Sequence, residues 1–137
     1  MTAQASPAYL QEMIALAKHA MENAYAPYSK FHVGCCLRSA TGHFYTGANV
    51  ENAAYPSSQC AEASALGNLI TAGDRVITDV VVLSGEVEHC PPCGNCRQKL
   101  SEFITPDTKI HFCTPTHWLE THSVYSLLPY MFKHHLR

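Results

Sequence analysis

Apolar residues follow a helical period near the start of the chain. Intervals of three and four residues link Leu10, Met13, Ile14, Ala17, Ala20 and Met21, which predicts an amphipathic helix. Ser6 and Pro7 suit the N-cap and the first helical position of this helix. The turn over residues 26–29, which contains Pro27, is expected to end it.

The rest of the chain alternates between strand and helix patterns. Two strand-like segments, 31–38 and 43–50, are joined through Ala40-Thr41-Gly42, and this spacing predicts a β-hairpin. The later patterns predict, in order, a helix from about Cys60 to Ala72 capped by Gly73, a strand covered on both faces over 77–84, a helix roughly over 93–103, a short strand over 109–113, and a weaker strand-or-helix region over 116–128. This order predicts an α/β fold in which a mixed sheet lies between helix layers.

Composition narrows the class of protein. The length of 137 residues predicts a single domain over 1–137, and a hydrophobic share of 47% excludes a disordered chain. Charged residues make up 15%, against about 25% in a typical soluble domain, which would suit a surface partly covered by partner subunits. The net charge of −2 argues against an electrostatic grip on nucleic acid or on an anionic membrane, so neither partner is expected.

Targeting signals and cysteine usage point to a location. No apolar run approaches the roughly 20 residues of a membrane span. The N-terminus shows no basic region followed by an apolar segment, so no signal peptide is expected. Seven cysteines are an odd number for a disulfide scaffold. Reduced thiols in a cytoplasmic protein are therefore the prediction.

Three cysteines and a glutamate carry the chemistry. Cys93 and Cys96 are three residues apart at a predicted helix start, so they share a face and can chelate one ion, while Cys60 begins another helix. The positive ends of both helix dipoles favour ionised sulfurs. Three protein ligands leave the fourth tetrahedral position of zinc open, as in catalytic sites. Glu62 shares a helical face with Leu66 and should point inward, where it can shuttle protons.

Other uses of these cysteines stay open on spacing alone. A lone C-x-x-C also occurs in redox pairs, in half of a structural zinc site, or as two core cysteines. Cys90 forms a second C-x-x-C with Cys93, so a closed four-cysteine zinc site is formally possible. The upstream C-x-E of Cys60 and Glu62 favours catalysis, because H-x-E…P-C-x-x-C, with cysteine able to replace the histidine, is the signature of zinc nucleobase deaminases.

Further motifs make the similarity specific. They are C-A-E over 60–62, P-C-G-x-C-R-Q over 92–98, A-Y-A-P-Y-S-K-F-x-V-G over 24–34, G-x-N-x-E-N-A-x-Y over 47–55, and L-L-P-x-x-F over 127–132. With these motifs in this order, nearly the whole chain resembles the small, three-cysteine type of cytidine deaminase. The resemblance implies a three-layer α/β/α sandwich with about five strands in its mixed sheet.

The resemblance also assigns roles. It implies that Cys60, Cys93 and Cys96 hold one Zn²⁺ per chain and that Glu62 is the proton shuttle. Within one chain it implies that Phe31 stacks on the base, that Asn49 and Glu51 contact the ribose, and that backbone groups near Ala61 contact the pyrimidine. Between subunits it implies that Ala53 and Tyr55 approach the 5′-end of a nucleoside bound to a neighbouring subunit. It also implies that Phe132 closes the pocket of an adjacent subunit. Sites shared in this way imply an oligomer, and this type is typically a homotetramer.

Two positions depart from the family pattern. Ala63 stands where many members have an arginine that donates to the zinc-bound thiolates, which leaves Arg97, four residues after Cys93, for this task. Pro91 replaces a usual serine or threonine, although its carbonyl can still accept from the amino group of the substrate.

The predicted function is hydrolytic deamination of cytidine and deoxycytidine to the corresponding uridines and ammonia, a reaction of pyrimidine salvage. A blasticidin S deaminase is a related alternative, but those enzymes lack the N-x-E-N motif present here over 49–52. A deaminase of polynucleotides would need a basic surface. A non-enzymatic zinc or thiol-redox protein is the remaining alternative, and an outward-facing Glu62 would favour it.

Overall fold

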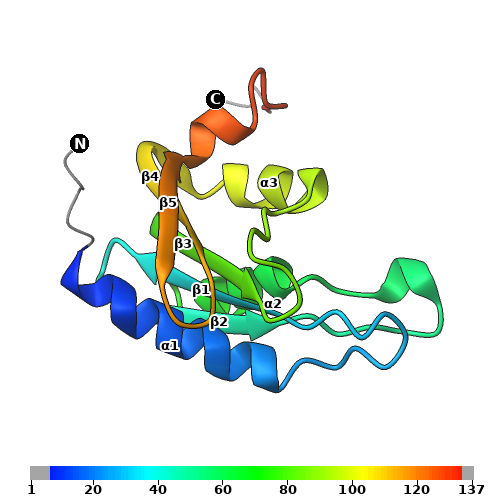
Figure 1. Ribbon diagram of the computed structural model, residues 1–137. Helices are drawn as coiled ribbons and strands as arrows, with labels where there is room; N and C mark the ends of the chain where they lie inside the picture. The colour runs from blue at the N-terminus through cyan, green and yellow to red at the C-terminus, as the bar shows by residue number, and fades with distance from the viewer. Residues whose placement is uncertain (1–6, 134–137) are drawn as a thin grey trace.

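The computed structural model describes residues 7–133 of the chain. Its elements, in order, are α1 (Ala8–Glu22), β1 (Val33–Ser39), β2 (Phe44–Ala48), the short 3₁₀ helix η1 (Tyr55–Ser57), α2 (Ala61–Thr71), β3 (Ile77–Ser84), α3 (Gly94–Ser101), β4 (Ile104–Cys113), β5 (Trp118–Ser123) and the 3₁₀ helix η2 (Val124–Leu127). The five strands form one sheet in the order β2-β1-β3-β4-β5 (Figure 1). Only β3 and β4 are parallel neighbours, so the sheet is mixed.

Helices cover both faces of this sheet. On one face α1 packs with Cys36, Val81 and Leu83 in one buried cluster. On the other face α2 and α3 pack with Cys35, Val80 and Val82 in a second cluster. Adjacent residues of one strand thus enter opposite clusters, as the alternation of side chains along a strand requires. The three-layer α/β/α sandwich and its mixed sheet are confirmed.

Most predicted elements are present with shifted ends. The strand over 77–84 matches β3 at both ends, and the helix from about Cys60 to Ala72 corresponds to α2. Gly73 follows α2 with a φ of 99°, and its N–H donates to the carbonyl of Ile70, so its predicted capping role is confirmed. The first helix begins at Ala8 after Pro7, whereas its predicted N-cap, Ser6, lies outside the described residues.

Two predicted strand starts were wrong. The first strand begins at Val33 and not at residue 31, because the backbone N–H groups before Val33 bond to side chains and to a turn instead of a neighbouring strand. β4 begins at Ile104, five residues earlier than predicted. A register shift opposite Ile77 and Asp79 interrupts it there, where Thr108 Oγ1 donates to the carbonyl of Ile77, and this irregular start hid the strand pattern.

The weaker region over 116–128 divides into β5 and η2. The strand pairs with β4 at the sheet edge, and the 3₁₀ helix turns the chain toward α3. Within the part of the chain that the structure describes, no helix is long and apolar enough to span a membrane.

Candidate metal centre and catalytic cavity

The starts of two helices bring three cysteines together. Cys60 is the N-cap of α2 and Cys93 is the N-cap of α3, while Cys96 lies in the first turn of α3. Their Sγ atoms all lie within 4.8 Å of one another. Among the described residues these three form the one such cluster of candidate ligands, and Cys90 is not part of it. This arrangement matches a three-thiolate metal centre with one position left for another ligand.

The pKa shifts of these three thiols are those expected at a site that binds a divalent cation. Hydrogen bonding from the backbone N–H of Cys96 lowers the pKa of Cys93, as a helix N-terminus should. Burial raises the pKa of Cys96 and of Cys60, and the nearby Glu62 carboxylate adds to both shifts. The helix ends therefore favour ionisation at Cys93, while the other two sulfurs need a cation to ionise at neutral pH. Zn²⁺ fits this set of soft donors.

Glu62 points into the protein beside the cysteines. Its side chain is 5% exposed, which confirms the predicted inward orientation. Burial raises the pKa of the Glu62 carboxyl, and hydrogen bonding to its own backbone N–H and to Cys96 opposes that rise. A buried carboxyl next to a metal centre is placed to accept and return a proton.

A cavity of about 590 Å³ opens in front of this centre. It is lined by all three clustered cysteines, by Glu62, and by five other residues that the sequence singled out, namely Phe31, Asn49, Glu51, Tyr55 and Ala61. They come from the segments before β1, after β2 and at the start of α2, two of which extend together beyond the sheet at the right of Figure 1. Phe31, Asn49, Glu51 and Ala61 therefore meet at one cavity with the cysteines, and Tyr55, which the resemblance assigns to a neighbouring subunit's site, borders the cavity of its own chain.

Asn49 and Glu51 make contacts within the protein as well as facing the cavity. The Asn49 side chain donates from Nδ2 to the carbonyl of Phe31 at 2.7 Å and accepts at Oδ1 from the N–H of Val33 at 2.9 Å. Glu51 accepts hydrogen bonds from the Ser29 hydroxyl and from the backbone of Ser29 and Tyr28, which together lower its pKa. Its carboxylate therefore stays charged at neutral pH.

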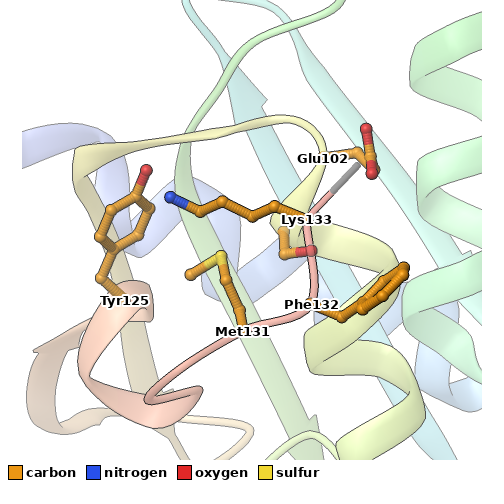
Figure 2. A pocket seen from close by; sticks show the side chains of 6 residues that line it. Glu102, Tyr125, Met131, Phe132 and Lys133 are labelled. Atoms are coloured by element: carbon orange, nitrogen blue, oxygen red, sulfur yellow. The ribbon is translucent and has the colours of Figure 1, made fainter. Parts of the chain in front are cut away.

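Two of the residues expected to contact the substrate lie outside this cavity. Ala53 is exposed in the segment before η1. Phe132 is 75% exposed and lies beside α3, where Gln98 Nε2 donates to its carbonyl at 3.1 Å, and it shares a pocket with Glu102, Tyr125 and Lys133 (Figure 2). The resemblance assigns Ala53 and Phe132 to the site of a neighbouring subunit, so their positions within one chain leave these roles as predictions.

Arg97 holds the cysteine segment in place through carbonyl groups. Its Nε donates to the carbonyl of Pro92 at 2.8 Å and its Nη1 to that of Leu127 at 2.9 Å. These bonds join the start of α3 to η2. Its predicted donation to the metal-bound thiolates stays a prediction.

Sequence reasoning missed several residues of the cavity wall. Ser29, Ser58, Gln59 and Cys90 line it, and none was singled out as a substrate contact. Ser29 and Ser58 lie inside or beside the quoted motifs, which was the available signal. Cys90 was considered only as a fourth metal ligand. It is 8% exposed and packs in the hydrophobic cluster on the sheet face that α2 and α3 cover. Pro91, whose carbonyl was noted as an acceptor, also lines the cavity.

The sequence is similar to a known family of zinc-binding enzymes. A family model described as "Cytidine and deoxycytidylate deaminase zinc-binding region" matches residues 8–112. The chain is 38% identical over 119 residues to a cytidine deaminase of Halalkalibacterium halodurans, covering 87% of this chain and 90% of that protein. It is 36% identical over 120 residues to a cytidine deaminase of Sporosarcina psychrophila, covering 88% of each.

Solved structures give the same result. The crystal structure of cytidine deaminase from Burkholderia pseudomallei superposes with a TM-score of 0.82 at 36% identity, covering 88% of this chain and 97% of that one. The cytidine deaminase from Mycobacterium leprae gives a TM-score of 0.78 at 36% identity, covering 90% and 99%. The cluster of three sulfurs, the buried glutamate beside it and these matches lead to one conclusion: the chain belongs to the zinc-binding cytidine and deoxycytidylate deaminase family.

Proposed function

We propose that this protein catalyses the hydrolytic deamination of cytidine and 2′-deoxycytidine, consuming water and releasing uridine or 2′-deoxyuridine and ammonia. The observation that carries the proposal is the cavity in which three clustered thiols and the buried Glu62 face Phe31, Asn49 and Glu51. The names of the relatives, all cytidine deaminases, support the same substrate class.

The metal centre and Glu62 divide the chemistry. Cys60, Cys93 and Cys96 would hold the zinc ion, which would supply the Lewis acidity that makes water a nucleophile near neutral pH. Glu62 accepts the proton of the attacking water at its carboxylate. It then delivers that proton to N3 of the cytosine ring. It next takes up the proton of the hydroxyl group added at C4 and passes it to the amino group, which leaves as ammonia. Its burial keeps bulk water away from these transfers.

The cavity wall supplies recognition. In the proposed complex the Phe31 ring stacks on the base and the backbone beside Ala61 meets the pyrimidine edge. The Pro91 carbonyl accepts from the amino group of the substrate. Asn49 keeps one N–H and Glu51 keeps acceptor capacity beyond their contacts with the protein, and both groups suit sugar hydroxyls.

We also propose that the protein is a homotetramer. Tyr25, Tyr28, Val50 and Tyr55 are large apolar side chains between 48% and 87% exposed, and they lie on the two segments that border the cavity. Such a patch beside a site is typical of an interface. Ala53, Tyr55 and Phe132 would then reach a neighbouring subunit's cavity. Light scattering coupled to gel filtration tests this, and a monomer at micromolar concentration would refute it.

We also propose that the protein is located in the cytoplasm. The described residues include all seven cysteines, and none of them forms a disulfide. A zinc centre built from free thiols needs a reducing compartment to stay intact.

An absorbance assay on a panel of substrates tests the proposed reaction. We expect turnover of cytidine and deoxycytidine, and far slower turnover of cytosine and blasticidin S, because the first lacks the sugar and the second carries a different substituent in its place. Metal analysis on the same sample should give one zinc per chain. Turnover of blasticidin S alone would move the chain to the related deaminase, and no turnover with one zinc per chain would refute the proposal.

A further inference from the structure

One wall of the cavity is a loop without regular structure. Residues 28–32 precede β1, and Ser29 and Phe31 of this loop face the cavity. The loop does not belong to the sheet, so no strand ladder fixes its backbone. Whatever holds it also sets where the Phe31 ring stands relative to Glu62.

Side chains take the place of a strand ladder. Every backbone N–H from Tyr28 to Val33 has a partner, and five of the six partners are side chains. The bonds are Tyr28 to Glu51 Oε1 at 3.0 Å, Ser29 to Glu51 Oε1 at 3.1 Å, Lys30 to the Ala26 carbonyl at 3.0 Å, Phe31 to Ser29 Oγ at 3.0 Å, His32 to Glu86 Oε1 at 3.1 Å, and Val33 to Asn49 Oδ1 at 2.9 Å. The loop is therefore held by the side chains of Glu51, Asn49 and Glu86 and by that of its own Ser29.

Ser29 is the junction of this arrangement. Its hydroxyl donates to Glu51 Oε2 and accepts the N–H of Phe31. The Ser29 hydroxyl oxygen thus connects the Glu51 carboxylate to the backbone of Phe31, and both of these residues line the cavity. Without this oxygen, the Phe31 N–H loses its partner and Glu51 loses its only side-chain donor in this loop.

The loop backbone needs such support. Lys30 has a φ of 62°, in the left-handed region that costs a side-chain-bearing residue free energy. It stands between Ser29 and Phe31. A conformation of this kind persists only where surrounding contacts hold it, and it is often found at functional sites.

We propose that Ser29 is a positioning residue for the substrate: its hydroxyl fixes the Phe31 ring and the Glu51 carboxylate at the separation that a nucleoside requires. This inference rests on the proposed function, because it assigns Phe31 and Glu51 to the base and the sugar. The contribution lies in binding and not in the proton transfers, which belong to Glu62.

The first measurement follows the loop itself. Hydrogen exchange with the zinc-loaded protein should show faster exchange of the Phe31 amide in Ser29→Ala, by at least about threefold, with α1 and β3 unchanged. Ser29→Thr keeps the hydroxyl and should restore wild-type exchange. Thr105→Ala is a matched control, because Thr105 is exposed near the start of β4 and its hydroxyl makes the same kind of local bond. It accepts the backbone N–H of Asp107, two residues later, at 3.2 Å. Unchanged exchange at Phe31 in Ser29→Ala would overturn the proposal.

The second measurement separates positioning from stability. We expect Ser29→Ala to raise KM for cytidine about three- to tenfold, with kcat within about twofold, and Ser29→Thr to restore KM. Thr105→Ala should leave both constants unchanged. An unchanged KM beside faster loop exchange would make Ser29 merely structural and refute the proposal, as would a loss confined to kcat. A wild-type protein that turns over no nucleoside would refute the proposed function instead, and the exchange result would still decide whether the hydroxyl holds the loop.

Discussion

The position of Glu62 depends on a close approach between α2 and β2. Adding a single methyl group at Gly47 of β2 tests this dependence. Gly47 lies in β2, paired with Cys35 of β1, directly beneath the first two turns of α2. A Cβ added there would stand 2.3 Å from the backbone nitrogen of Ala65 and 2.5 Å from the carbonyl oxygen of Ala61. Both atoms belong to helix backbone and cannot turn aside.

The size of the effect follows from these distances. Ordinary van der Waals contact begins at 3.4 Å, so in Gly47→Ala the start of α2 must move by about 1 Å. Overpacking of this kind costs about 1–3 kcal/mol of unfolding free energy, which lowers Tm by about 3–10 °C in a domain of this size. Cys60 and Glu62 flank Ala61 and move with the helix. A displacement of about 1 Å at a reacting centre can reduce kcat/KM about 100-fold.

Calorimetry and steady-state kinetics on zinc-loaded protein check both effects. Gly67→Ala is the matched control, because Gly67 lies in the same helix with nothing within 4 Å of its added Cβ. That variant should gain up to about 1 kcal/mol from the better helix propensity of alanine and keep full activity. Wild-type Tm and kcat/KM in Gly47→Ala would refute the claim that this contact sets the position of Glu62.

Two further predictions concern charge. Burial alone would raise the pKa of Asp79, but hydrogen bonds from His111 and Thr78 outweigh it and hold this pKa below 3.8. Asp79→Asn should therefore cost about 1–3 kcal/mol in urea unfolding at neutral pH. This deficit should shrink as pH falls below about 4, where the carboxylate of the unfolded chain protonates first and that of the native protein follows at lower pH; a deficit independent of pH would contradict this. The resemblance places an arginine at position 63 next to the metal-bound thiolates, so in Ala63→Arg the acidic limb of the pH profile of kcat/KM should move to lower pH by about one pH unit. An unmoved limb would count against a role for the missing arginine.

The sequence predicted the elements whose burial pattern is uniform. β3 matches its predicted ends because both of its faces are covered and seven of its eight positions are buried, so nearly every side chain is apolar or small. The inward Glu62 followed from the helical period that it shares with Leu66, which packs against the core between α2 and the sheet. Cys60 and Cys93 could be placed at helix starts because the motifs mark those starts.

Features that depend on contacts distant in sequence could not be predicted. Phe31 was assigned to a strand because it is aromatic and followed by apolar residues, yet its backbone is fixed by Ser29 and Asn49 instead of by a strand. The two carbonyl partners of Arg97 include Leu127, thirty residues away, and no local pattern reveals that pair. The residues assigned to neighbouring subunits stay predictions, since their evidence would lie in another copy of the chain.

The most direct test of the account is Glu62→Gln measured for zinc content, unfolding temperature and turnover together. The amide keeps the size of the side chain and removes its ability to carry a proton, while the three cysteines are untouched. The account predicts one zinc per chain, a Tm close to wild type, and a loss of kcat on cytidine of about 100-fold or more. A variant that keeps its zinc and its fold and still turns over cytidine at a comparable rate would contradict the central role given to this buried carboxyl.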